Sequence, residues 1–335
     1  MKTTITNRPL ILRVVTVVIA LMMIGAVSAQ DTVPIGPIGS VEAGDFRALA
    51  VTADGQRLLI ADAENDELRV YDFSDPSLPT LINSVDLEGE PLAVTAAEDF
   101  ALVAVSTPDE GDAVRVIAPS RYSRTQGYIE TNSIDVPDGV RQIVISPDNY
   151  WALALSANGY TLLELVSAGE INSLPTESQI VDAAVGGDTA FLLSESSLST
   201  QSLRVNLDVQ RVEQIELEGV GQQIVINPRL TLGVITLEGN RLLMFNPSTL
   251  DTFSTFEAGG AAIMDVQFVS GEEGEWLAVS REGGSEITLL DVNDPSNVGD
   301  LGSLSTLFES PVQAMTTYNE LIIVTDGQTV RIFAP

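Results

Sequence analysis

The chain has 335 residues, 44% of them hydrophobic, which is enough to bury a sizeable core. It carries 16 Lys and Arg against 47 Asp and Glu, a net charge of −31 that repels nucleic acid and anionic membranes. Histidine and cysteine do not occur in the sequence. This excludes disulfides, Ser-His-Asp and Cys-His catalysis, histidine-ligated haem, and ordinary zinc or copper sites.

Residues 1–29 are typical of a secretory signal peptide. Lys2, Arg8 and Arg13 precede an apolar run over 14–27. The small-residue sequence Val27-Ser28-Ala29 at the end of this run is typical of a cleavage site. We expect a mature chain that begins at Gln30, is secreted or periplasmic, and has no contact with the membrane. An uncleaved membrane anchor is the alternative, although the apolar run is shorter than the roughly 18 residues that span a bilayer.

The rest of the chain repeats one pattern seven times. Each copy has a strand of small and apolar residues, a turn, a strongly apolar strand, a second turn, another apolar strand and a weaker fourth strand. We align the copies on the last strongly apolar residue of the first strand. These anchors are Val51, Val94, Ile145, Val185, Ile226, Phe268 and Met315. Their spacing is that of a four-stranded propeller blade and is too long for a leucine-rich repeat.

The sequence therefore predicts an all-β fold over residues 30–335, a single-domain, seven-bladed β-propeller of four-stranded antiparallel blades. The expected blades are 45–87, 88–136, 137–175, 176–217, 218–257, 258–305, and 308–335 together with 36–42. The last copy stops after its third strand, whereas Ile38 to Val41 resembles the fourth-strand segment Ile82 to Val85. We expect the N-terminal strand to complete the last blade, which removes exposed sheet edges.

Two copies contain similar segments, Val70 to Ser77 and Leu289 to Ser296, each followed by a fourth-strand segment. In these segments the chain resembles the LVIVD-repeat group of bacterial propellers and, more loosely, the WD-repeat and YVTN-type propellers. The resemblance implies an exported propeller that acts as a display or interaction module. We interpret the Asp-Pro-Ser part of both segments as a type I turn, because proline fixes φ and the acid satisfies main-chain N–H groups.

The rim that carries the loops into the first strands is the expected binding site, because ligands of propellers usually meet the channel there. Polar residues fall at this rim in six copies, four or three residues before the anchor. They are Arg47, Glu90, Arg141, Asp182, Gln222 and Asp265. Two arginines among acids can recognise a polar partner. The other interpretation is a solvated, charge-balanced rim.

Carboxylates are the main groups left for catalysis or metal binding. Asp62, Glu64 and Asp66 are the best calcium candidates, since hard cations prefer oxygen ligands, but no segment has the full acidic loop of a calcium site. Other acidic clusters are interpreted as solvated turns. A set of arginines also falls at one phase of the repeat, where ion pairs with acids are expected. Its members are Arg69, Arg115, Arg204 and Arg331.

The favoured hypothesis is an exported, non-catalytic binding or scaffolding propeller, monomeric, that recognises a protein, peptide or glycan on one rim and needs no cofactor. The alternative is a lactonase-like or glycan-acting propeller enzyme that uses carboxylates, with or without calcium. A passive structural domain of a secreted complex is a third reading. Convergent acids around an oxygen-lined cavity favour the enzyme, and a broad open rim favours the binding protein.

Overall fold

The computed structural model describes residues 36–335 with internal gaps. The gaps are 43, 99, 108–110, 121–126, 137–138, 147–148, 157–158, 166–168, 176–178, 204–210 and 272–273, and the side chains of 169–175 and 211–213. The predicted signal peptide, residues 1–29, lies outside the described residues. The described residues belong to one compact unit of strands and turns. Within them, no helix is long and apolar enough to cross a membrane.

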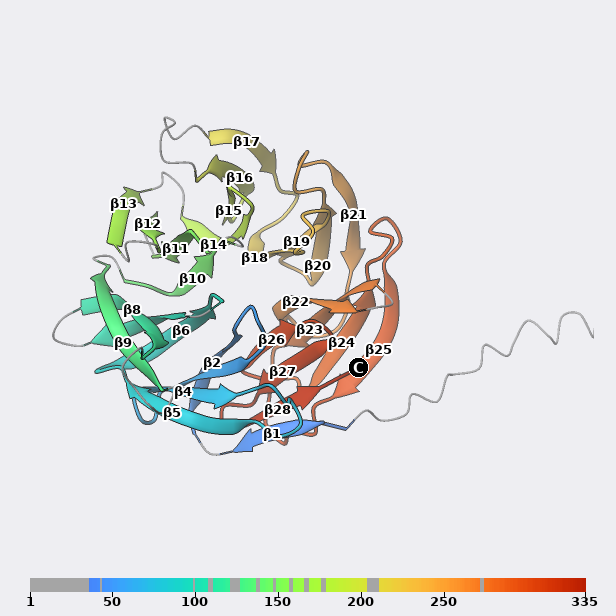
Figure 1. The fold of residues 1–335 in the computed structure, drawn as a ribbon. Coiled ribbons are helices and arrows are strands. Elements are labelled where there is room, and N and C mark those ends of the chain that lie inside the picture. Colours follow the sequence, from blue (N-terminus) through green and yellow to red (C-terminus); the bar gives the residue numbers. More distant parts are fainter. Residues whose placement is uncertain are drawn as a thin grey trace, which may run out of the picture. The chain divides into compact units, whose positions relative to one another are not determined.

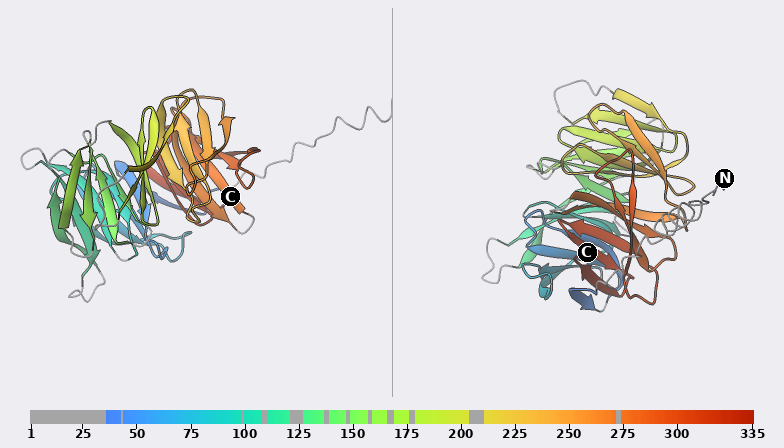
Figure 2. Two further views of the ribbon diagram at one scale, coloured as in Figure 1. Left: turned by 90° about the horizontal axis from the view of Figure 1, so that it is seen from above. Right: turned by 90° about the vertical axis from the view of Figure 1, so that its right-hand side faces the viewer.

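The strands form seven antiparallel four-stranded sheets arranged as a ring (Figures 1 and 2). The first blade has β2 (Phe46–Val51), β3 (Arg57–Asp62), β4 (Glu67–Asp72) and β5 (Thr80–Asp86). The second has β6 (Glu90–Ala96), β7 (Ala101–Thr107), β8 (Gly111–Pro119) and β9 (Tyr128–Asp135). The third has β10 (Gln142–Ile145), β11 (Trp151–Leu155), β12 (Gly159–Glu164) and β13 (Gly169–Pro175).

The remaining four blades repeat this order. The fourth has β14 (Ile180–Gly186), β15 (Thr189–Ser194), β16 (Ser197–Ser202) and β17 (Arg211–Glu216). The fifth has β18 (Gly221–Ile226), β19 (Gly233–Leu237), β20 (Arg241–Phe245) and β21 (Thr252–Glu257). The sixth has β22 (Ile263–Gly271), β23 (Gly274–Arg281), β24 (Glu286–Asp291) and β25 (Gly299–Ser305). The seventh has β26 (Ala314–Tyr318), β27 (Leu321–Thr325), β28 (Thr329–Phe333) and β1 (Gly39–Glu42). The predicted seven-bladed propeller is thus confirmed.

The core consists of apolar clusters between neighbouring blades. Second strands are apolar on consecutive residues because both of their faces are covered, as in β3, where Leu58 to Ala61 are fully buried. One cluster lies between each pair of neighbours, including blades 7 and 1 and blades 4 and 5. Each blade therefore depends on both of its neighbours for burial of its two faces.

The ring closes where the two ends of the chain share a sheet. β1 pairs antiparallel with β28 from Gly39 opposite Ile332 to Glu42 opposite Thr329, so the predicted N-terminal strand completes the last blade. A second contact joins the same blades near the β2–β3 turn. There the ring of Tyr318 fills the space beside Gly55, where an added Cβ would lie 2.4 Å from the ring. Gly55 also has φ of +70°, which favours glycine.

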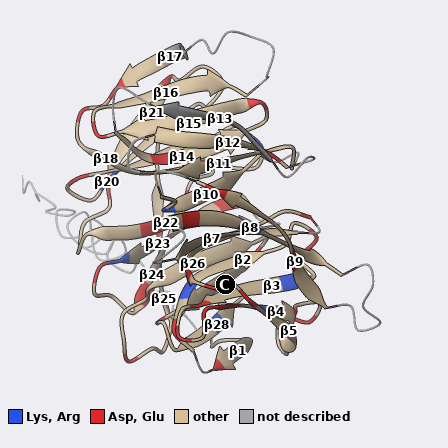
Figure 3. Ribbon diagram, turned by 90° about the vertical axis from the view of Figure 1, so that its left-hand side faces the viewer, with Lys and Arg blue, Asp and Glu red and all other residues tan. Residues whose placement is uncertain are grey.

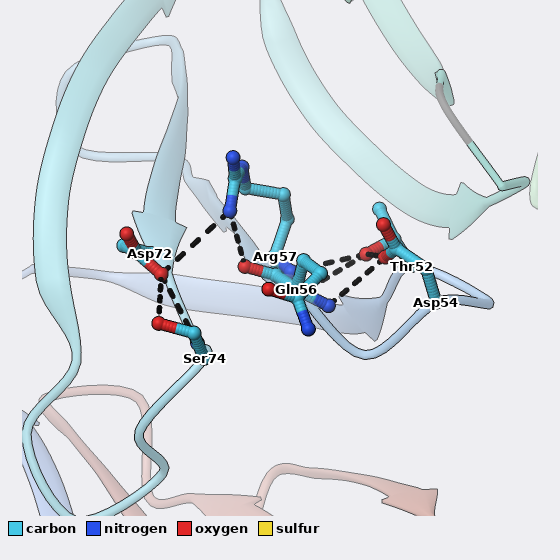
Figure 4. A network of polar contacts seen from close by, with 6 residues as sticks. All are labelled: Thr52, Asp54, Gln56, Arg57, Asp72 and Ser74. Atoms are coloured by element: carbon cyan, nitrogen blue, oxygen red, sulfur yellow. Dashed lines mark hydrogen bonds and ion pairs between the residues drawn. The ribbon is translucent and has the colours of Figure 1, made fainter.

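The Asp-Pro-Ser segments form turns held by their own side chains. Asp72 accepts hydrogen bonds from the main-chain N–H and the hydroxyl of Ser74, at 3.0 and 2.8 Å, and its carboxylate also faces Arg57 (Figure 4). These hydrogen bonds lower the pKa of Asp72. In the Asp-Pro-Ser parts themselves, Asp75 accepts from the N–H of Ser77 and Asp294 accepts from the N–H of Ser296, both at 3.0 Å. These segments therefore have a local structural role, as the sequence predicts.

Candidate functional site

The first strand of most blades begins with a β-bulge on the same rim. In β2, β6, β14, β18 and β22 one residue near the start of the strand is left without a partner on the second strand. In blades 3 and 7 the residue directly before β10 or β26 takes the same place. We call these seven residues the rim ring: Arg47, Leu92, Arg141, Val181, Gln222, Met264 and Gln313. All of them are exposed except Val181, which is half-buried.

Blades 1 and 2 bring the predicted rim residues Arg47 and Glu90 together. The Arg47 guanidinium lies 3.1 Å from the carboxylate of Asp45 and 3.7 Å from that of Glu90. All three side chains are about half exposed, with 48% for Arg47. Ion pairs as exposed as these add little stability, so the charges are free to be used by a partner.

Arg141 and Gln222 lie further around the same rim. The Arg141 guanidinium donates a hydrogen bond to the main-chain carbonyl of Ile180 in the next blade. The Gln222 side chain is exposed, at the bulge of β18. Both residues thus stand on the open side of the rim, as expected from their place four residues before the anchor.

The residue after each rim-ring position forms a second layer along the first strands, one position below the rim. We call this layer the channel belt: Ala48, Ala93, Gln142, Asp182, Gln223, Asp265 and Ala314. It is polar across blades 3 to 6 and alanine in the other three. The structure therefore places the predicted site residues Asp182 and Asp265 one layer below the exposed rim.

Side chains of the channel belt tie neighbouring blades together. Asp182 accepts a hydrogen bond from the side chain of Gln142 and one of 2.7 Å from the main-chain N–H of Ile224. The Gln223 side-chain amide donates to Asp265 at 2.7 Å and accepts from the Val266 N–H at 3.0 Å. These contacts link blade 3 to blade 4, blade 4 to blade 5 and blade 5 to blade 6. The chain has no cysteine, so no disulfide can link these blades.

Both belt carboxylates are perturbed by their surroundings. Burial raises the pKa of Asp182 to about 6, although hydrogen bonds from Ile224, Gln142 and Ala183 favour its charged form. Burial also raises the pKa of Asp265, against hydrogen bonds from the Gln223 and Gln267 side chains. Desolvation outweighs hydrogen bonding at both positions, and the repulsion between the two acids adds to the effect at Asp182.

The belt opens into a cavity of about 750 Å³ that follows the first strands of blades 3 to 7. Gln142, Asp182 and Gln223 line its upper end, near the rim ring. Arg229, Glu275 and Asn319 line the other end, where the first strands turn into the second strands. The cavity is therefore polar at both ends, with one buried acid at each end.

The alignment of the copies misses Leu92 and Gln313 in the rim ring, whereas Val181 and Met264 lie at the expected position but do not stand out as polar candidates. The strand register makes Ala96, opposite Ala101, the equivalent of Val51, which is two residues later than the anchor chosen in that blade. The anchor in blade 7 is early by the same amount. Because side chains alternate with a period of two, such a slip keeps the apolar pattern intact and gives no signal in the sequence.

The predicted calcium ligands lie on the β3–β4 hairpin. Asp62 is fully buried, and its carboxylate accepts from the N–H groups of Asp45 and Glu64, from Asn65, and from Arg69 at 2.5 Å. Among the described residues no three acidic side chains are grouped closely enough to hold a metal ion. Calcium binding here stays a prediction, which a melting-temperature titration with CaCl2 against NaCl of equal ionic strength tests.

The equivalent arginines of the repeat have structural partners where they are described. Arg69 and Arg115 form ion pairs with Asp62 and Glu130, and Arg69 also stacks on the ring of Phe46. Arg331 instead donates to the carbonyl of Thr306 and lies over the Phe308 ring at 4.6 Å. Arg204 lies outside the described residues.

A scan against protein-family models and a search of curated proteins found no match to this chain. The β-propeller is a fold that hosts unrelated functions, so it does not identify an activity by itself. Any function of this chain must therefore be inferred from the rim ring, the channel belt and the cavity.

Proposed function

We propose that this protein is an exported, non-catalytic β-propeller that binds a protein or peptide through its rim ring. The observation that carries the proposal is the repeated bulge at the start of the first strands. At a bulge one residue is left out of the hydrogen-bonded pairing between two strands, and its side chain points in a new direction. Bulges are frequent beside functional sites. Here the bulges of five blades present their residues on one rim.

The composition of the rim ring supports a protein or peptide rather than a glycan. It combines Arg47 and Arg141 with Leu92 and Met264, two apolar side chains that are each 38% exposed. Arginine and methionine, with the aromatic residues, are enriched in protein interfaces, where charged pairs at the margin set orientation. A broad ring of such residues suits a binding surface better than a closed catalytic pocket.

The test is capture of a partner by wild-type protein, by Arg47→Ala/Arg141→Ala, and by Arg57→Ala, which lies at the β2–β3 turn on the opposite rim and belongs to neither proposed site. Tagged proteins are incubated with the extracytoplasmic fraction of the source cells, and captured proteins are quantified by mass spectrometry. We expect at least one protein to be captured by the wild type and the control, and to be lost with the double variant. Equal capture by all three would refute a role for the rim arginines.

One observation favours an enzyme as the second candidate. Asp182, with a pKa raised to about 6, lines the cavity, and a carboxyl group with such a pKa can transfer protons near neutral pH. Against this, each oxygen already accepts a main-chain N–H, from Ala183 and Ile224. Hydrolysis of a nitrophenyl glycoside or a γ-lactone that is lost in Asp182→Asn would establish the enzyme and overturn the binding proposal.

Export and kinship with the LVIVD-repeat propellers are part of the same proposal. The positive segment, apolar run and small-residue site of residues 1–29 support export. The matching turns at Asp72 and Asp291 support the kinship. N-terminal sequencing of protein recovered outside the cytoplasm is expected to begin at Gln30. Recovery of a chain that begins at Met1 would show that the segment is retained.

A further inference from the structure

The cavity mouth opposite the rim ring contains a buried carboxylate that is only half satisfied. Glu275, near the start of β23 and opposite Ser270 of β22, is 9% exposed and lines the cavity. Its Oε2 accepts a hydrogen bond of 2.6 Å from the side-chain amide of Asn227. Its Oε1 is buried and accepts no hydrogen bond from the described part of the chain. Leaving a buried acceptor unpaired is costly for a folded protein.

Arg229 is the cationic partner of this carboxylate, but its contact with Oε1 is weak. Its Nε lies 3.9 Å from Oε1 of Glu275, beyond hydrogen-bond distance, and the Arg229 side chain is 70% exposed. An exposed ion pair of this geometry contributes little. Arg229 therefore covers the carboxylate without being fixed there, and its long side chain can move into solvent.

Other groups at the same mouth are suited to hold a polar ligand. Ser270, Tyr318 and Asn319 line the cavity beside Glu275 and bring two hydroxyl groups and an amide. The N–H of Ser270 donates to the carbonyl of Asn319 at 3.1 Å, which fixes the two turns relative to each other. The strongly negative charge of the whole chain, −31, raises the concentration of cations near this opening.

We propose that this mouth is a binding site for a cationic nitrogen group, an ammonium or a guanidinium, which donates to Oε1 of Glu275 after Arg229 has moved aside. The chemistry is that of a charge-assisted hydrogen bond in a partly desolvated pocket. The group can belong to a free small amine or to a lysine or arginine side chain of a peptide. The site is separate from the rim ring and does not depend on the function proposed for it.

The experiment is isothermal titration calorimetry with three probes and four proteins. The probes are agmatine, the blocked peptide acetyl-Gly-Lys-Gly-amide, and its neutral counterpart acetyl-Gly-Gln-Gly-amide. The proteins are wild type, Glu275→Gln, Arg229→Ala, and Glu238→Gln, an exposed acid in the β19–β20 turn that serves as the charge-matched control. Preference for agmatine indicates a free amine as the ligand, and preference for the lysine peptide indicates a peptide side chain.

We expect Glu275→Gln to weaken binding of the cationic probe by tenfold or more, on the order of one charge-assisted hydrogen bond. Arg229→Ala should strengthen it, because a competing cation is removed, and Glu238→Gln should leave it unchanged. The proposal is overturned if wild type binds neither cationic probe, if the neutral peptide binds equally well, or if Glu275→Gln and Glu238→Gln lose affinity alike. If circular dichroism shows that Glu275→Gln does not fold, the Arg229→Ala variant decides. An affinity of this variant for the cationic probe that is equal to or weaker than that of the wild type overturns the proposal.

Discussion

Individual arginines in this acidic protein hold the loops that lead into the first strands. Arg281 donates to three carbonyls of the loop before β22, from Ala258 to Ala261, and Arg241 donates to the carbonyl of Glu218 before β18. Arg331 contacts Thr306 before β26 in the same way. A guanidinium is suited to this because it offers several donors in a fixed plane. The scarce positive residues therefore help to shape the rim that carries the rim ring.

Blade 1 uses an acid for the same purpose, which gives a test of stability. Asp62→Ala removes the acceptor for the Asp45 N–H in the loop before β2 and breaks the buried ion pair with Arg69. We expect a loss of about 3 kcal/mol in the free energy of unfolding, typical of breaking a buried pair. Chemical denaturation measures the loss. Glu64→Ala, at an exposed position of the same hairpin, is the control and should change little.

The raised pKa of Asp182 predicts a pH dependence of stability. Its pKa is about 6 in the folded protein against an ordinary value of 3.8, so between these values the folded state binds a proton that the unfolded state has lost. Stability from this group is therefore fully present below about pH 4 and is lost as pH rises through 6. Asp265, whose pKa is also raised, acts in the same direction.

Asp182→Asn isolates this contribution. The variant has no proton to exchange at this position, so its free energy of unfolding should fall less than that of the wild type between pH 5 and pH 7. We expect a difference of about 1–2 kcal/mol between the two pH dependences. Denaturant titrations at both pH values measure it. Parallel pH dependences in wild type and variant would show that Asp182 titrates near its ordinary pKa.

At the scale of elements, the fourth strands are kept from pairing with other molecules by irregularities. They form the outer edges of the blades, and the described register has a bulge in β5, β9, β13, β21 and β25. Bulges interrupt the row of free main-chain groups on an edge and increase its twist. This protects edges that also expose apolar residues such as Leu81 and Phe253.

Sequence could predict the elements of this fold but not their register. Blade number, strand order and the role of β1 follow from apolar runs separated by turn residues, and these are confirmed. The bulges leave no such pattern, because neither Arg47 nor Gln222 is a residue type that marks a bulge. The sequence predicts only part of the channel belt. It indicates Asp182 and Asp265 as candidates, but the hydrogen bonds that they receive from Gln142 and Gln223 can be recognised only once neighbouring blades are placed side by side.

Deleting β1 tests how far closure of the ring stabilises the fold. A chain that lacks residues 36–42 loses the pairing with β28 and exposes that strand as an edge, and Val41 no longer covers its apolar cluster. We expect a decrease in melting temperature of more than 5 °C, far more than removal of residues 30–35 alone causes. Differential scanning calorimetry measures it, with a chain lacking only residues 30–35 as the control. A melting temperature equal to that of the control would mean that β1 adds no stability.

Two effects with opposite sign act on the stability of the whole molecule. The apolar cores between the blades stabilise the closed ring, and the large negative charge destabilises it. Acidic positions occur on the turns of many blades, and basic positions are few (Figure 3). Without residues 1–29 the chain has 13 arginines against 47 acids, a charge of −34. Self-repulsion of this size disfavours the compact state, and cysteine is absent from the sequence, so no disulfide can offset it.

Salt should therefore stabilise this protein to an unusual degree. Raising NaCl from 10 mM to 1 M shortens the screening length from about 30 to about 3 Å, which removes most repulsion between acids on different turns but leaves buried pairs such as Asp62 and Arg69 largely intact. We expect the melting temperature to rise by several degrees, at about 2–4 °C per kcal/mol of stabilisation. Choline chloride at the same concentrations should act as strongly as NaCl, because screening does not depend on the identity of the cation. A gain seen with NaCl alone would point to bound sodium, and no gain with either salt would show that the surface charges are too far apart to matter.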